Sequence, residues 1–260
     1  MHIKIDGLDA FATTGGRDFD PALPLVILIH GAGLDNSVWA LHSRWFAHHG
    51  FSVLAVDLPG HGRSGGAPLP TIEAMADWIV KLIDAVGAGK AALVGHSMGS
   101  LVSLDAAARH PEKVTSLALI GAAAAMPVHP DLLAAAKANS HAAIDMINLW
   151  GHGSHATQGG SQSPGLWMIG AGEKVLERAK PGVIHNDLAA CATYAGGLEA
   201  AAKVTCAATV IAGARDLMTP LKAVKALAAA IKGARLVVLE GAGHMLMAER
   251  PDAVLDALRR

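Results

Sequence analysis

The sequence predicts an α/β fold in which a mostly parallel sheet is covered by helices on both faces. Short, almost wholly apolar runs recur along the chain, and longer helical patterns separate them. Of the 260 residues, 52% are apolar and 17% are charged, which is sufficient for a large core. Strands that are apolar throughout are typical of parallel sheets buried between helices. Their alternation with helices indicates βαβ units in an open, doubly wound sheet.

The expected elements can be given in order along the chain. The opening segment, about residues 2–14, alternates apolar and polar side chains and predicts a β-hairpin at the sheet edge. Buried strands are expected at 25–30, 52–56, 91–95, 115–121, 208–213 and 235–240. Helices are expected near 37–48, 71–86, 97–109, 220–231 and 250–258. Thr71, Pro220 and Pro251 are typical helix-starting residues and support three of these helices.

The regular alternation breaks between Gly121 and about Ala207. This stretch is rich in Ala, Gly and His and shows no convincing strand. Helical patterns occur near 131–149, 171–180 and 186–202. The middle of the stretch, residues 151–165, is typical of a polar, flexible loop. We therefore expect a helical lid, residues 122–200, that is inserted into the core and packs over one edge of the sheet. The expected core comprises residues 1–121 and 201–260.

Charge and cysteine content exclude several functions. The formal net charge is −1 and no Lys or Arg run occurs, so a nucleic-acid partner is not expected. Cys191 and Cys206 have no spacing for zinc or a disulfide framework, and no metal is expected. The N-terminus lacks a signal-peptide pattern, and the longest apolar stretch is shorter than the ~20 residues that span a bilayer. We expect a soluble, cytoplasmic protein, monomeric or homodimeric, with no membrane partner.

The sharpest motif is GHSMG (95–99), directly after an expected strand and before an expected helix. In a G-x-S-x-G nucleophile elbow the chain turns so sharply that the serine is strained, and flanking glycines avoid backbone collisions. Ser97 Oγ would be exposed at the carboxyl end of the sheet, beside a helix N-terminus that favours negative charge. Ser97 is thus the candidate nucleophile, and an ordinary glycine-rich turn is the alternative.

A serine hydroxyl is a weak nucleophile and needs a base, which this architecture places downstream of an acid. Among fourteen histidines, His244 lies in a glycine-rich segment beyond the last strand, where it can return over the sheet edge. Asp216 follows the strand 208–213 at the same end of the sheet as Ser97, and is the candidate that orients the imidazole. Asp57, at the end of an earlier strand, is the main rival, and we assign it a structural role.

Acyl transfer also requires hydrogen-bond donors for the oxyanion. The residue after the nucleophile supplies one backbone N–H, which assigns Met98. The second donor is expected from the loop after the strand 25–30, where small residues let the main chain approach the substrate. The Ala32 N–H is the first choice there and Leu34 the second.

Five motifs in order resemble the α/β-hydrolase superfamily, and the resemblance covers almost the whole chain. They are HGAGLDNSVW (30–39), DLPGHGRS (57–64), GHSMG (95–99), GARD (213–216) and GAGHMLMAERP (241–251). The resemblance implies eight mostly parallel strands, a lid inserted at 122–200, and the same triad and oxyanion donors as above. Relatives that resemble haloalkane dehalogenases or epoxide hydrolases carry an aspartate at the elbow. This chain has Ser97 there, which excludes those branches of the family. The motifs are most similar to those of small carboxylesterases, lactonases and carbon–carbon bond hydrolases.

The leading hypothesis is a carboxylesterase that works through an acyl-enzyme. Ser97 would attack the ester carbonyl, and His244 would pass the proton to the leaving alcohol before water releases the acid. Cleavage of a carbon–carbon bond in a vinylogous diketone, or opening of a lactone, would use the same triad. A ligand-binding receptor with slow hydrolysis is a third possibility. No cofactor is implied, because the triad and oxyanion hole supply what acyl transfer needs.

The lid is expected to supply a mostly apolar pocket wall. Candidate lining residues are Leu34, Trp39, Met126, Trp150, Trp167, Met168 and Met245. Such a pocket favours a neutral ester with a modest acyl or alcohol part. Two basic residues of the lid, Arg178 and Lys180, could instead pair with a substrate carboxylate. The histidines of HGAG and GHSMG, with His61 and Arg63, are expected to stabilise their loops.

Overall fold

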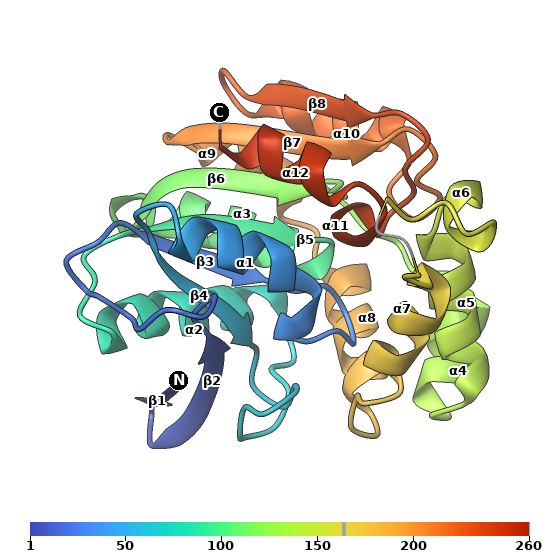
Figure 1. Ribbon diagram of the computed structural model, residues 1–260, viewed down its shortest axis with the longest axis horizontal. Coiled ribbons are helices and arrows are strands. Elements are labelled where there is room, and N and C mark those ends of the chain that lie inside the picture. The colour runs from blue at the N-terminus through green and yellow to red at the C-terminus, as the bar shows by residue number, and fades with distance from the viewer. Residues whose placement is uncertain (163–164, 260) are drawn as a thin grey trace.

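In the computed structural model, which describes residues 1–162 and 165–259, eight strands form one sheet (Figure 1). Their order across the sheet is β1-β2-β4-β3-β5-β6-β7-β8. The strands are β1 (His2–Ile5), β2 (Leu8–Thr13), β3 (Leu25–Ile29), β4 (Ser52–Asp57), β5 (Ala91–His96), β6 (Val114–Ile120), β7 (Ala207–Gly213) and β8 (Arg235–Leu239). The β1–β2 and β2–β4 pairs are antiparallel and the others are parallel. The predicted fold class and edge hairpin are confirmed.

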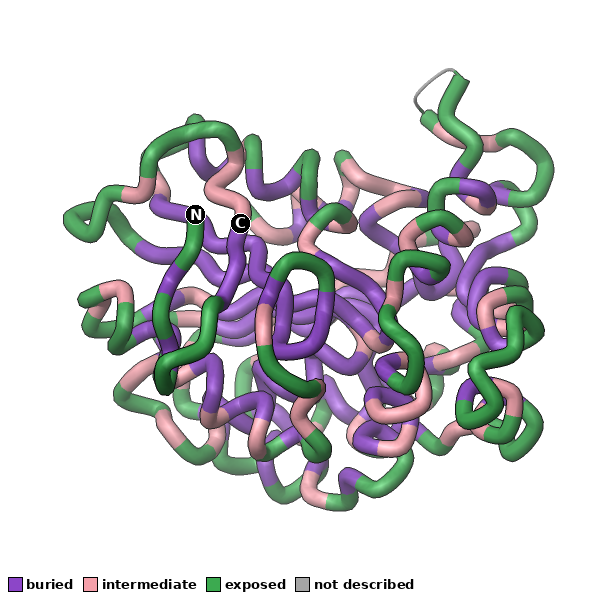
Figure 2. The backbone as a smooth tube through the Cα atoms, turned by 90° about the horizontal axis from the view of Figure 1, so that it is seen from below, coloured by how far each residue is buried: buried purple, intermediate pink, exposed green. Residues whose placement is uncertain are grey.

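The central strands are buried because helices cover both faces of the sheet. Figure 2 shows that the buried backbone gathers at the centre of the molecule. All residues of β3 and β4 are buried. One face is covered by α2 (Ile72–Ala85), α3 (Met98–Arg109) and α10 (Leu221–Ala230). The other is covered by η1 (Asn36–Trp39), α1 (Ala40–Ala47), α11 (Leu246–Glu249) and α12 (Pro251–Leu258). A short turn, η2 (Pro111–Lys113), precedes β6.

Six helices lie between β6 and β7 within the described part of the chain. They are α4 (Pro130–Lys137), α5 (His141–Gly151), α6 (Ser154–Thr157), α7 (Met168–Leu176), α8 (Val183–Thr193) and α9 (Gly197–Lys203). Helices α4 to α8 lie to one side of the sheet in Figure 1, whereas α9 packs against α3 and α10 of the core. The division into a lid (122–200) and a core stays a prediction.

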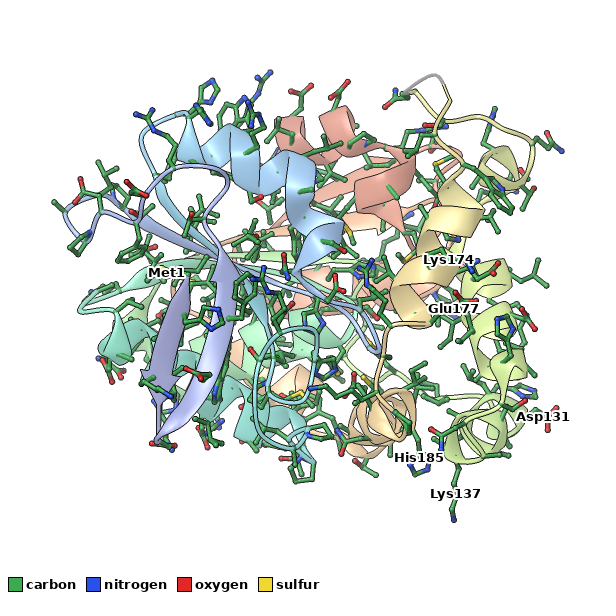
Figure 3. All side chains as sticks on the ribbon, turned by 60° about the horizontal axis from the view of Figure 1, so that its bottom comes forward. Met1, Asp131, Lys137, Lys174, Glu177 and His185 are labelled. Carbon is green, nitrogen blue, oxygen red and sulfur yellow. The ribbon has the colours of Figure 1, made fainter. Side chains whose placement is uncertain are left out.

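The expected loop at 151–165 differs from the structure, because the short helix α6 forms within it. Residues 163 and 164 of that expected loop lie outside the described residues. Helix α4 of the insertion is amphipathic, since it buries Leu132 and Ala136 while Asp131 and Lys137 point outward (Figure 3). Among the described residues, none of the helices has the length and apolar character needed to cross a bilayer.

Candidate active site

The turn from β5 to α3 holds Ser97 in a strained backbone conformation. Its φ of 52° lies in a region that L-residues rarely adopt. Ser97 N–H donates to the Ile120 carbonyl (2.9 Å), which anchors the turn to β6. A Cβ on Gly95 would lie 2.1 Å from the carbonyl oxygen of Gly99, and one on Gly99 would lie 2.3 Å from that of Ile29. Both glycines of the motif are therefore required by close backbone approach.

His244 and Asp216 form a buried hydrogen-bonded pair beside this turn. Nδ1 of His244 lies 2.8 Å from Oδ2 of Asp216 and donates to it. The carboxylate also accepts hydrogen bonds from the amides of Met218 and Thr219 and from the Thr219 hydroxyl. Burial would raise the pKa of Asp216, but the charge of His244 and these hydrogen bonds hold that pKa below its usual value. The carboxylate is thus ionised and oriented toward the imidazole.

The rival carboxylate, Asp57, has other partners. Its Oδ1 accepts from the backbone and side-chain amides of Asn36, and its Oδ2 accepts from the Arg63 amide. These bonds join the loops after β3 and β4. The geometry therefore pairs His244 with Asp216 and gives Asp57 a loop contact.

Several contacts fix the loop that carries His244. The His244 amide donates to the Gly151 carbonyl at the end of α5 (2.8 Å). Nε2 of His96 lies 2.9 Å from the carbonyl oxygen of His244. Burial and the neighbouring His244 lower the pKa of His96 to about 3, so His96 is neutral and donates this hydrogen bond. The buried carboxylate of Glu249 accepts from the amides of both Gly243 and Gly153. The loop is therefore bonded both to the core and to the insertion.

The expected oxyanion donors lie on either side of Ser97. Met98 is the first residue of α3, and the first N–H groups of a helix have no intrahelical acceptor. Ala32 lies in the loop after β3, where the Leu34 amide closes a turn on the Gly31 carbonyl (3.2 Å). A Cβ on Gly31 would lie 3.1 Å from Cβ of Ser97, so this loop approaches the elbow closely. Their role as oxyanion donors stays a prediction.

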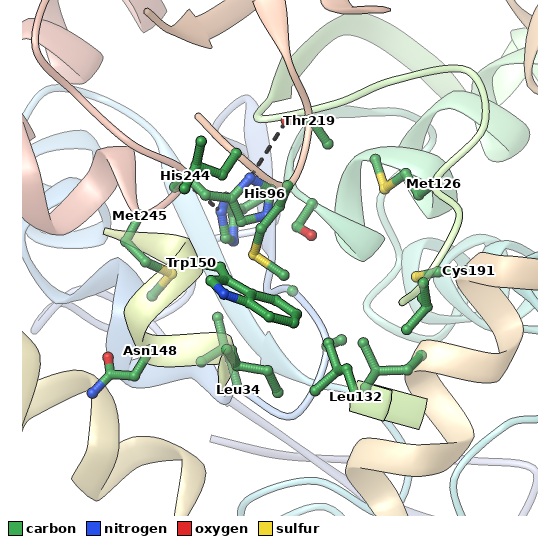
Figure 4. Close-up of a pocket in the computed structure, with 18 of the residues that line it drawn as sticks. Leu34, His96, Met126, Leu132, Asn148, Trp150, Cys191, Thr219, His244 and Met245 are labelled. Carbon is green, nitrogen blue, oxygen red and sulfur yellow. Dashed lines mark hydrogen bonds between the residues drawn. The ribbon is translucent and has the colours of Figure 1, made fainter. Parts of the chain in front are cut away.

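A cavity of about 360 Å³ opens over these groups (Figure 4). Ser97, His244 and Ala32 line it, so the candidate nucleophile, the candidate base and one expected oxyanion donor face the same space. Much of the remaining wall is apolar and comes from both the core and the insertion. The apolar lining includes Leu34, Met126, Leu132, Ile147, Trp150, Leu176, Leu188 and Met245.

Four of the expected pocket residues line this cavity, and three do not. Leu34, Met126, Trp150 and Met245 belong to the lining. Trp39 is fully buried between η1 and the sheet, because its side of η1 faces the core. Trp167 is 67% exposed and its ring lies over Gly170, while Met168 is buried at the start of α7. The expectation that these three residues line the pocket is therefore wrong.

The two basic residues proposed to meet a substrate carboxylate are also placed elsewhere. Arg178 forms an ion pair with Asp35 (2.7 Å), and Lys180 contacts the Ser64 carbonyl (3.5 Å). Neither is among the residues that line the cavity.

Sequence reasoning missed lining residues that come from the insertion and the acid turn. Examples are His129, His152, Cys191 and Thr219. Only Thr219 had a local signal, because a hydroxyl three residues after a turn aspartate commonly bonds within the turn. Burial raises the pKa of the Cys191 thiol, which therefore stays protonated and contributes an apolar surface.

A strained serine at a strand–helix turn, with a histidine and a buried carboxylate at the same sheet edge, defines the α/β-hydrolase class. Residues 26–257 match the alpha/beta hydrolase family, and the chain belongs to this family.

Particular relatives include hydrolases of more than one kind. The chain is 31% identical over 246 residues to a pimeloyl-[acyl-carrier protein] methyl ester esterase of Aromatoleum aromaticum, covering 88% of this chain and 94% of that protein. It is 25% identical over 240 residues to an (E)-2-((N-methylformamido)methylene)succinate hydrolase of Acinetobacter baylyi, covering 90% and 88%. Its fold is similar to that of an enol-lactonase from Burkholderia xenovorans LB400, with a TM-score of 0.89, 26% identity, and coverage of 100% and 98%. The protein is therefore a hydrolase.

Proposed function

We propose that this hydrolase cleaves carboxylic esters through an acyl-enzyme on Ser97. The observation that carries the proposal is the 2.8 Å hydrogen bond from His244 Nδ1 to Asp216, beside a cavity lined by both His244 and Ser97. With Nδ1 donating, the second ring nitrogen, Nε2, carries the lone pair of a general base. This is the tautomer that acyl transfer needs.

The steps follow from these roles. Ser97 Oγ attacks the ester carbonyl while His244 Nε2 takes its proton, and the negative carbonyl oxygen is bound by the amides of Ala32 and Met98. The imidazolium formed is stabilised by the ionised Asp216. Collapse of the intermediate breaks the bond to the leaving alcohol, which receives the proton from His244. Water, activated by the same histidine, then releases the acid and restores Ser97.

The cavity favours a neutral and largely apolar substrate. Among the described lining residues, the titratable side chains are histidines and Cys191, and none is Lys or Arg. A carboxylate in this space would have no cationic Lys or Arg to offset its desolvation. The volume of about 360 Å³ is near the lower end for small-molecule sites, which suits an ester of short or medium length.

Lactone opening is the second candidate, supported by the similarity to the enol-lactonase. It requires no change of residues, because a lactone carbonyl presents the same electrophile to Ser97 and the leaving alcohol simply stays attached. Carbon–carbon hydrolysis of a diketone would use the same residues. A receptor that hydrolyses its ligand slowly would differ from all of these in turnover.

The test is hydrolysis of nitrophenyl esters from acetyl to palmitoyl by the wild type and by Ser97→Ala. We expect turnover of the short or medium esters and its loss in the variant. Activity that survives Ser97→Ala would refute the assigned nucleophile. Inactivity of the wild type across the panel would refute the ester proposal, and lactones and diketones would be tested next.

A further inference from the structure

Helix α8 of the insertion carries a buried carboxylate, Asp187, into contact with two loops of the core. Its Oδ2 accepts a hydrogen bond from the amide of Gly33 (2.8 Å) and lies 2.7 Å from Nε2 of His61. The side chains of His61 and Asp187 are 1% and 0% exposed. Asp187 therefore joins the insertion to the loop after β3 and to the loop after β4.

The hydrogen-bond partners of His61 identify it as an imidazolium. Nδ1 lies 3.0 Å from the Pro59 carbonyl oxygen, and Nε2 faces the Asp187 carboxylate. Both partners accept hydrogen bonds only, so both ring nitrogens carry a proton. Burial alone would lower the pKa of His61, but the charge of Asp187 raises it above its usual value. The other titratable groups facing this ring are His30, with ring centroids 4.8 Å apart, and Asp57.

The loop that Asp187 holds is the one that carries Ala32. Gly33 follows Ala32 directly and has a φ of +69°. A Cβ on Gly33 would lie 2.9 Å from Cγ1 of Ile184, which is also in α8. The helix therefore packs so closely against the loop that there is no room for a side chain at position 33. On its other side the loop approaches Ser97 through Gly31. The loop is thus held between α8 and the nucleophile elbow.

We propose that Asp187, charge-paired with His61, is a positioning residue that fixes the Ala32 amide relative to Ser97. The inference rests on the proposed function, in which that amide binds the oxyanion. Because the oxyanion is absent from the bound substrate and develops only in the transition state and the tetrahedral intermediate, a displaced donor lowers kcat and leaves KM nearly unchanged. Loss of one such donor costs about 10²–10³ in rate.

Two substitutions separate the charge of Asp187 from its ability to accept hydrogen bonds. Asp187→Asn keeps an oxygen that can accept from Gly33 but removes the charge opposite His61, whereas Asp187→Leu removes both. The matched control is Asp105→Leu, since Asp105 is a buried carboxylate that bonds Tyr194 and Arg109, and neither partner lines the cavity. We expect kcat to fall by about 10²–10³ in Asp187→Leu and by less in Asp187→Asn, with KM within about threefold. Asp105→Leu should keep the wild-type kcat even where its urea midpoint falls as far.

Amide hydrogen exchange at Gly33 tests the contact without any substrate. We expect faster exchange in Asp187→Leu than in the wild type or Asp105→Leu, because the amide has lost its buried acceptor. An unchanged kcat in Asp187→Leu, or a loss confined to KM, would overturn the inference while leaving the ester proposal intact. If the wild type turns over no ester, the proposed function fails instead. Equal exchange at Gly33 in the two leucine variants would then overturn the anchoring of the loop by Asp187.

Discussion

The substitution Asp216→Asn is expected to inactivate the enzyme by reversing the tautomer of His244. Oδ1 of Asp216 accepts from two backbone amides, those of Met218 and Thr219, each at 2.8 Å. An asparagine must keep its carbonyl oxygen at that position, so its NH₂ takes the place of Oδ2 opposite His244. Nδ1 can then bond only as an acceptor, which moves the proton to Nε2 and removes the lone pair with which His244 would accept the Ser97 proton.

Loss of the correct tautomer costs about 10⁴ in kcat, which corresponds to about 5 kcal/mol of transition-state stabilisation. The measurement is kcat on the best nitrophenyl ester at about pH 7.5, alongside the urea midpoint of each variant. The control is Asp57→Asn, which alters a buried carboxylate that contacts Asn36 and Arg63. Its kcat should stay within about tenfold of the wild type, since His244 is untouched. A folded Asp216→Asn variant with near-normal kcat, or a larger loss in Asp57→Asn, would refute the reasoning.

Three further predictions concern stability, specificity and pH. Gly95→Ala should destabilise the fold by about 3 kcal/mol or more, because the added Cβ would collide with the backbone of Gly99. Gly89→Ala, which has open space around it, should change the urea midpoint little. Equal urea midpoints for the two variants would contradict the close backbone approach at Gly95. Trp150→Ala enlarges the cavity and should shift the preferred acyl chain to a longer one, while the exposed Trp167→Ala should not, as a chain-length series will show. Burial lowers the pKa of His42 from 6.5 to about 4, so the unfolded chain binds the extra proton in that window and stability falls as pH drops through it. His42 accounts for about 3 kcal/mol of that fall in the free energy of unfolding, and His42→Gln should remove this contribution. If the wild type and His42→Gln have identical pH profiles of the unfolding free energy, the pKa of His42 is not lowered by folding.

The parts of the fold that follow from local pattern were predictable from the sequence. The six expected buried strands lie within one residue of their expected bounds, because continuous apolar runs bounded by turns have few alternatives. The pairing of His244 with Asp216 followed from the order of strand ends in a parallel sheet. Trp39 was misplaced because periodicity shows that a side chain is buried but not which buried space it fills.

Long-range contacts within the insertion were not predictable in the same way. Asp187 looks like any polar residue of a helix, and its bond to Gly33 joins positions 154 residues apart. Glu249 lies in the GAGHMLMAERP motif, in which His244 is the residue that the sequence singles out. The contact of Glu249 with Gly153 depends on where α6 begins. Such contacts are determined by how the insertion docks on the sheet edge, which no local spacing encodes.

The Glu249 carboxylate has a consequence for protein engineering. Because it accepts hydrogen bonds from Gly243, beside His244, and from Gly153, directly before α6, the core and the insertion share one buried carboxyl group. In a chimera that carries the insertion of a relative, these backbone contacts form only if the transplanted chain follows the same path at residues 151–153, where a Cβ on residue 153 would lie 2.8 Å from the Gly241 carbonyl oxygen. Transplanted insertions should therefore succeed only when the segment around residues 151–153 is kept from this chain. The boundary for recombination therefore lies inside the insertion, after the segment that follows the last residue of α5, and that segment should be transferred together with the loop of His244.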